Sequence, residues 1–78
     1  MPTIHREAGF DFQINTNDHP PAHVHAFYQG ALVIIEFETD VDEREVFGRI
    51  TTAQRRRALR IVKERHGYFL MRWTEIHG

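Results

Sequence analysis

The sequence predicts an α+β fold: a small antiparallel four-stranded β-meander followed by two C-terminal α-helices packed on one sheet face. Three observations support this prediction. Apolar and polar residues alternate in short runs before residue 50, which is the period of half-buried strands. Apolar residues recur every three or four positions after residue 52, which is the period of an amphipathic helix. The connections between the early runs are short, and short connections favour antiparallel neighbours.

The chain of 78 residues is expected to form one domain, with strands over about 2–50 and helices over about 52–77. It contains no cysteine, which excludes disulfides and thiolate metal sites. No apolar run approaches the roughly 20 residues of a membrane span, and the N-terminus lacks the apolar core of a signal peptide. A cytoplasmic location without a membrane partner is therefore expected.

The first two strands are predicted over residues 2–6 and 10–15. Pro2 is tolerated at the start of a strand, and Ala8–Gly9 favours a tight turn between the two. The apolar residues of the second run should point inward and the polar ones outward, in the strict alternation Phe10, Asp11, Phe12, Gln13, Ile14, Asn15. Residues 17–21 should then bend, because Asn and Asp favour turns and the prolines Pro20 and Pro21 each remove a backbone donor; either X–Pro bond can be cis.

The third and fourth strands are predicted over residues 23–29 and 31–38, separated by Gly30. The fourth run is rich in β-branched residues, which favours a central or well-covered strand. Val24, Ala26, Tyr28, Val33, Ile35 and Phe37 should join Phe10, Phe12 and Ile14 in the core. Residues 40–44 are predicted as a charged turn and residues 45–50 as a short extended segment.

Thr51 and Gln54 match a capping box, so a helix is expected from residue 52. Its apolar stripe comprises Leu59, Val62, His66, Phe69, Leu70, Trp73 and Ile76, of which Leu59, Val62, Phe69, Leu70 and Trp73 should face the sheet. One helix over 52–77 would be about 39 Å long, whereas a domain of this size has a radius of gyration of about 11–12 Å. Two helices meeting at His66–Gly67 are therefore predicted, although the stripe keeps its phase across Gly67.

The alternation that buries the aromatic residues gathers polar side chains on the opposite sheet face. This uncovered face should carry His5, Asp11, Gln13, His23, His25, Phe27 and Glu36. Phe27, Leu32 and Ile34 would give it the apolar character of a groove or an interface.

Residues 17–25 hold three histidines and one aspartate, the densest chemistry in the chain. His23 and His25 lie two apart on a predicted strand, about 6.6 Å apart along one face, so their imidazoles can converge on one metal ion. His19 and Asp18 are candidates for further ligands, as are the carboxylates of Asp11 and Glu36. A divalent transition metal such as zinc is the cofactor that this set would hold, although no closed four-ligand pattern is visible.

Other interpretations of the same residues stay open. His23 and His25 are candidate catalytic residues for metal-free acid–base chemistry, because histidine titrates near neutrality. Histidine-triad hydrolases carry a further histidine at the next alternate position, which Phe27 occupies here, so that family is disfavoured. Asp18 and the histidines would alternatively fix the bend or contact a partner chain.

Charge is unevenly distributed along the chain. Residues 1–45 have a net charge of −7 and residues 46–78 a net charge of +6. Arg55, Arg56, Arg60 and Lys63 are candidates for binding nucleic acid or an acidic partner protein. The opposing interpretation is that the two halves attract each other, with Arg57 and Arg60 paired to acids in residues 36–45.

The chain resembles a bacterial family known only as domain of unknown function family 4160. The resemblance is carried in order by residues 1–4 (MPTI), 17–25 (NDHPPAHVH), 48–50 (GRI) and 57–62 (RALRIV), together with Trp73. It departs from the usual pattern at Ile50–Thr51, where Leu–Pro is common, and at Tyr68–Phe69, where charged residues are usual. Members are small single-domain proteins often encoded beside another small protein, of family 2442, and this arrangement implies a toxin–antitoxin pair.

The leading hypothesis is therefore a small bacterial protein that acts through a partner protein encoded nearby, as a component of a toxin–antitoxin-like module. The first alternative is a metal- or histidine-dependent phosphoesterase or ribonuclease that uses His19, His23 and His25. The second is a nucleic-acid-binding module that uses the basic helix over residues 55–63. A homo-oligomer is compatible with each of the three.

Overall fold

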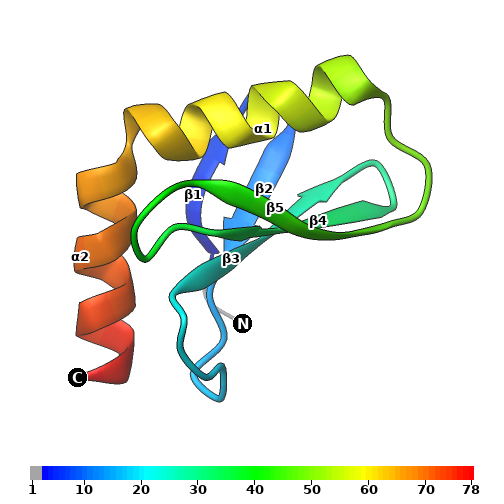
Figure 1. The fold of residues 1–78 in the computed structure, drawn as a ribbon. Helices are drawn as coiled ribbons and strands as arrows, with labels where there is room; N and C mark the ends of the chain where they lie inside the picture. The colour runs from blue at the N-terminus through cyan, green and yellow to red at the C-terminus, as the bar shows by residue number, and fades with distance from the viewer. Residues whose placement is uncertain (1–2) are drawn as a thin grey trace.

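The computed structural model describes residues 3–78, so the predicted role of Pro2 lies outside the described residues. A five-stranded antiparallel sheet forms one layer, and two helices lie against it (Figure 1). The elements are β1 (Thr3–Glu7), β2 (Phe10–Gln13), β3 (His23–Tyr28), β4 (Ala31–Glu36), β5 (Asp42–Phe47), α1 (Thr52–Glu64) and α2 (His66–His77). The Cα radius of gyration is 11.3 Å.

The strands follow one another across the sheet in chain order, from β1 to β5, as predicted for a meander. Two of the connections are tight turns in which both central residues have positive φ. Ala8 and Gly9 have φ of 53° and 82°, and Gln29 and Gly30 have φ of 45° and 82°. This backbone has the twist that suits a two-residue hairpin, so β1–β2 and β3–β4 are held in register by their turns.

The prediction of four strands was wrong by one. Residues 42–47 form β5, which pairs with β4, where the sequence predicted a charged turn over 40–44 and an extended segment over 45–50. Every β5 side chain is exposed except that of half-buried Val46. Edge strands commonly carry charged side chains that prevent pairing with another chain, and in β5 these occupy adjacent positions, so the period of two disappears.

The helices begin and end almost where the sequence places them. Thr51 caps α1: its hydroxyl accepts from the Gln54 amide at 3.1 Å, and its own amide donates to the Gln54 side chain at 3.1 Å. The two-helix prediction is confirmed, with Arg65 as the break (φ −114°, ψ 27°) and Gly67 inside the first turn of α2. Figure 1 shows α1 crossing one sheet face and α2 turning steeply away along one end of the sheet.

The core lies between α1, α2 and the inner face of the sheet. The predicted inward residues of β2, β3 and β4 are buried, except that Tyr28 is half-buried. Ala58 and Ile61 join Val62 at the α1 contact, whereas Leu59 and Leu70 are only half-buried. In α1 the predicted stripe was thus right at Val62 but missed Ala58 and Ile61. Small Ala58 adds little to a hydrophobic pattern although it is fully buried.

His5 lies on the helix-covered side of the sheet, so its predicted place on the open face was wrong. A register shift between Thr3 and His5 sets His5 opposite Phe12. The imidazole centroid is 5.9 Å from the Phe12 ring and 6.0 Å from the Phe69 ring. One extra residue in a strand reverses the side on which the following side chains project, and a bulge leaves no reliable mark in the sequence.

Candidate metal centre

Three of the six predicted candidate ligands converge where the bend meets β3. One ligand atom each from Asp18, His23 and His25 lies within 4.8 Å of the others. The two histidines project from β3 on the same side, as their spacing requires. Asp18 reaches them from the turn that precedes the strand.

The bend fixes the Asp18 carboxylate. The Asp18 amide donates to the Asn15 carbonyl at 3.2 Å, and the Asn15 amide donates to Asp18 Oδ2 at 3.1 Å. This short-range pair of bonds is the reason that Asp and Asn favour such positions. Only 15 % of the Asp18 side chain is exposed, so the carboxylate faces the histidines with little competition from water.

His23 is oriented by its own backbone neighbour. Its Nδ1 donates to the Pro21 carbonyl at 2.9 Å, since a carbonyl can only accept, so in the matching tautomer Nε2 is the nitrogen that carries the lone pair. That Nε2 lies 3.5 Å from Asp18 Oδ2. Metal-binding histidines are commonly held by such a bond from the second ring nitrogen to a carbonyl.

The predicted exposure of His23 was wrong, because the residue is buried. Trp73 of α2 lies over it, with 5.4 Å between ring centroids. Trp73 also contacts Phe37 at the end of the sheet, so α2 wraps that end and covers the first residue of β3. The sequence placed Trp73 in the core, but its reach to His23 depends on the angle at which α2 leaves Arg65.

One ring nitrogen of His25, Nδ1, is buried. Its Nδ1 makes no hydrogen bond within residues 3–78 and lies 3.7 Å from Asp18 Oδ2. Burial lowers the pKa of His25 below its usual value of 6.5, and the Asp18 carboxylate offsets this only in part. The ring is therefore neutral near pH 7, the protonation state in which an imidazole ligates a metal.

Two of the three separations in this group are close to the spacing that a metal requires, and the third is within 4.8 Å. Two ligands of a tetrahedral zinc ion stand about 3.3–3.6 Å apart when each bond is about 2.0–2.2 Å long. The separations from Asp18 Oδ2 to His23 Nε2 and to His25 Nδ1 are 3.5 and 3.7 Å. Small side-chain rotations would therefore suffice, and the buried orphan nitrogen of His25 would gain a partner.

The remaining candidates are not brought into this cluster. His19 is exposed and outside the group that the described residues form. The Asp11 carboxylate accepts from Thr3 and Arg6, and Glu36 lies 3.4 Å from Arg44. These carboxylates therefore make their contacts on the outer face of the sheet and are not part of the cluster.

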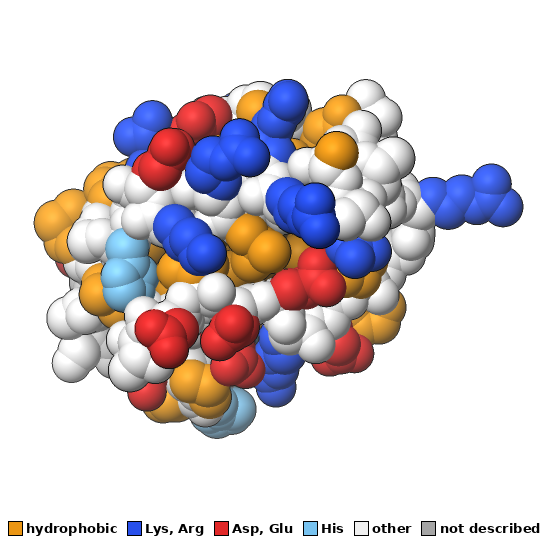
Figure 2. Space-filling view, turned by 45° about the horizontal axis from the view of Figure 1, so that its top comes forward, with side chains coloured by type: hydrophobic (Ala, Val, Ile, Leu, Met, Phe, Trp, Pro, Cys, Tyr) orange, Lys and Arg blue, Asp and Glu red, His pale blue; other side chains and the backbone are white. Residues whose placement is uncertain are grey.

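The basic residues of α1 form a separate feature on the far side of the helix layer. Arg55 pairs with Glu43 at 3.1 Å, but the other four bases have no carboxylate within 4.0 Å in residues 3–78: Arg56, Arg57, Arg60 and Lys63. The predicted pairing of Arg57 and Arg60 with acids of residues 36–45 is therefore not observed. Figure 2 shows a partly apolar hollow with Lys and Arg side chains along one side and Asp and Glu side chains along the other.

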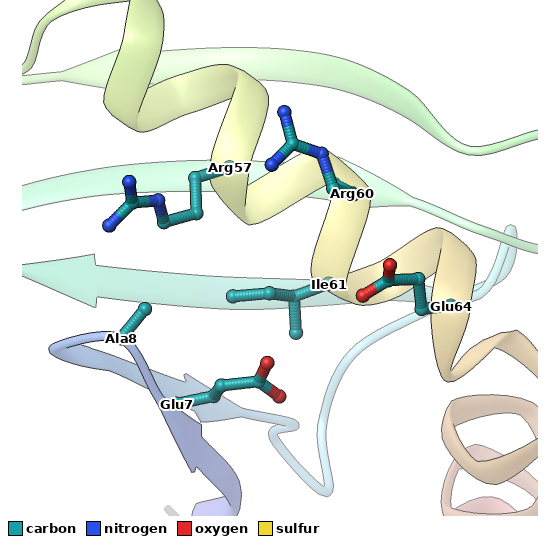
Figure 3. A pocket seen from close by; sticks show the side chains of 6 residues that line it. All are labelled: Glu7, Ala8, Arg57, Arg60, Ile61 and Glu64. Atoms are coloured by element: carbon teal, nitrogen blue, oxygen red, sulfur yellow. The ribbon is translucent and has the colours of Figure 1, made fainter.

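Two open hollows flank Arg60. The larger, of about 380 Å³, is lined by Glu7, Ala8, Arg57, Arg60, Ile61 and Glu64 (Figure 3). The smaller, of about 250 Å³, is lined by Arg56, Leu59, Arg60 and Lys63. Acids and bases share the first, whereas three bases surround a single leucine in the second, so only the second has the character of an anion-binding surface.

Comparison with known proteins places the chain without assigning an activity to it. Within the described residues neither helix is long and apolar enough to cross a membrane. No curated protein and no solved structure shows significant similarity to the chain. The model of a domain of unknown function, DUF4160, matches residues 9–74, which include the bend, the whole of β3 and Trp73. The chain belongs to the DUF4160 family, as its motifs indicate.

Proposed function

We propose that this protein binds one divalent transition metal ion through Asp18, His23 and His25. The observation that carries the proposal is the buried Nδ1 of His25, which has no hydrogen-bond partner in residues 3–78 and faces a fixed carboxylate. Two imidazole nitrogens and one carboxylate oxygen are ligands that zinc and iron(II) accept. The bond from His23 Nδ1 to Pro21 supplies the outer support that such sites share.

Three protein ligands would leave coordination positions for water or a substrate, as in catalytic rather than structural zinc sites. A metal held by these three residues would supply an activated water for hydrolysis at neutral pH. Phosphate-ester or RNA cleavage is one reaction of that class, and it stays a prediction from the sequence.

The test is metal binding by protein purified without an affinity tag. Elemental analysis should find about one zinc or other transition metal ion per chain, and titration calorimetry should show one site. His25→Ala and Asp18→Ala should each lower the affinity by more than about 100-fold, because they remove ligands rather than supporting groups. His19→Ala is the matched control, since His19 is exposed beside the cluster, and it should bind like the wild type.

Two results would contradict this proposal. One is a wild-type chain that takes up no ion at micromolar concentrations of zinc, cobalt or iron(II). The other is an equal loss of affinity in His19→Ala, which would indicate loose chelation by surface histidines. Circular dichroism of each variant separates ligand loss from unfolding.

A second candidate function is the binding of an acidic partner by α1. It is favoured by the four α1 bases without ion pairs in residues 3–78, Arg56, Arg57, Arg60 and Lys63. The family resemblance predicts a small partner protein encoded nearby, in a toxin–antitoxin-like module. Nucleic acid is the competing polyanion for the same surface.

A further inference from the structure

The sheet face turned away from the helices carries a continuous apolar row. Phe27 of β3 pairs with Leu32 of β4, and Leu32 pairs with Phe47 of β5, so the three side chains lie side by side across the strands. Ile34 is the next residue of β4 on this face. Phe47 is 49 % exposed, and the other three are half-buried although neither α1 nor α2 covers them.

Charged pairs of both signs flank this row. Arg6 lies 3.3 Å from Asp11 at the β1–β2 side, and Arg44 lies 3.4 Å from Glu36 at the β4–β5 side. An apolar centre with a charged rim is the anatomy of a protein interface. A strand with one solvated face instead carries polar residues on that face, as β2 does here.

We propose that the outer-face patch, Phe27, Leu32, Ile34 and Phe47, is the contact surface between two copies of this chain. The rim argues for a second copy, because a twofold contact presents the same surface to itself and needs acids and bases on both sides. The rim also argues against nucleic acid, since Asp11, Glu36 and Glu45 outnumber Arg6 and Arg44 on this face.

The size of the face sets the strength expected of the contact. Five strands about 4.8 Å apart and about 20 Å long present about 400 Å² in projection, or about 800 Å² for two copies. Stable interfaces bury about 1,200–2,000 Å². The pair should therefore be weak and depend on concentration, with the two sheets about 10 Å apart.

Sedimentation velocity from 10 µM to 1 mM is the test, and the wild type should shift from monomer toward dimer across that range. Phe47→Asp should stay monomeric at 1 mM, because it places a charge in the most exposed part of the apolar row. The matched control is Met71→Asp on α2, since Met71 is 50 % exposed and lies outside the patch. It should dimerise like the wild type.

Phe47 lies on an exposed edge strand, so the variant should fold, and its far-ultraviolet circular dichroism and metal content should match the wild type. Phe47→Ser, which adds no charge, should weaken the dimer at least tenfold. A wild type that is monomeric at 1 mM would overturn the proposal. So would a loss of dimer in Met71→Asp equal to that in Phe47→Asp.

Discussion

At the scale of single residues, side-chain direction follows from strand parity wherever the ladder is regular. Phe10, Phe12 and Ile14 are buried as alternation predicts. His5 fails because a bulge precedes it, and His23 fails because a helix covers the outer side of its strand end. Both failures have long-range causes, the strand partner in one and the course of α2 in the other, and neither is encoded in the neighbouring residues.

Comparing Gly48 with Gly30 separates the cost of a left-handed backbone from the cost of a steric clash. Their φ angles are +85° and +82°, so alanine at either site should lose about 1–2 kcal/mol from the left-handed backbone alone. A Cβ at Gly48 would stand 3.1 Å from the Ala31 Cα, whereas none of the surroundings lies within 4 Å of a Cβ at Gly30. Gly48→Ala should therefore be the more destabilising by about 1–3 kcal/mol.

Urea unfolding of both variants measures this difference directly. Equal midpoints for Gly48→Ala and Gly30→Ala would mean that the chain after β5 shifts away from Ala31 without cost. A larger loss at Gly30 would contradict the packing described here.

At the scale of elements, one ion pair ties the β1–β2 hairpin to the corner between the helices. Arg65 Nε donates to Glu7 Oε1 at 2.7 Å, and His5 Nε2 lies 2.8 Å from the same oxygen. The residue that breaks the helix thus also fixes the first hairpin. The sequence predicted a break at the neighbouring His66–Gly67, but not the choice of Arg65, because that choice depends on a contact across 58 residues.

This pair should make stability depend on pH in the acid range. Bonds from His5, and then from Arg65, lower the pKa of Glu7 below its usual value of 4.5. The folded protein therefore holds this proton less tightly than the unfolded chain does. The stabilisation is complete above pH 4.5 and is lost as the pH falls through the lowered pKa.

Chemical unfolding at pH values from 6 to 3 checks this, with Glu7→Gln compared with the wild type. The variant should lose stability less steeply below pH 4.5. Glu45→Gln on β5 is a control, because Glu45 has no ion-pair partner in residues 3–78, and its profile should follow the wild type. Parallel profiles for Glu7→Gln and the wild type would contradict the role given to the pair.

At the scale of the whole molecule, the charge asymmetry of the sequence persists in three dimensions. Most arginines outside α1 have an acidic neighbour within 4.0 Å, including Arg6, Arg44, Arg65 and Arg72. Four bases of α1 have none within residues 3–78, namely Arg56, Arg57, Arg60 and Lys63, so a positive surface remains beside the acidic edge strand β5. Composition predicted the imbalance, but only the fold shows which bases are left without partners in residues 3–78.

An acidic partner bound by α1 should be released by salt and by removal of these bases. Coexpressed with the protein encoded beside it, the chain should co-elute at 50 mM salt, and Arg56→Ala with Arg60→Ala and Lys63→Ala should abolish this. Arg55→Ala is the matched control, because Arg55 is already paired with Glu43. A labelled 20-nucleotide RNA tests the alternative, whose affinity should fall with a slope of about −0.7 per phosphate contact in log salt.

Unchanged co-elution in the triple variant would exclude α1 as the contact surface. Binding of the RNA with no co-elution of the protein would favour the nucleic-acid alternative.

Fold class, strand order and the two-helix break were predictable because they follow from local period and short connections. The candidate metal centre was predictable only in part. The sequence placed Asp18, His23 and His25 near one another, but it could not exclude His19, whose exposure depends on how the bend closes. Nor could it identify Trp73 as the cover of His23, since 50 residues separate them.

Trp73 is the sole tryptophan of the chain and rests on a proposed ligand. Its indole fluorescence should therefore report on the proposed metal site. A paramagnetic ion bound beside His23 should quench this fluorescence. A closed-shell ion should preserve its intensity and shift its emission wavelength. Tryptophan fluorescence should therefore distinguish a paramagnetic ion from a closed-shell ion without an added label.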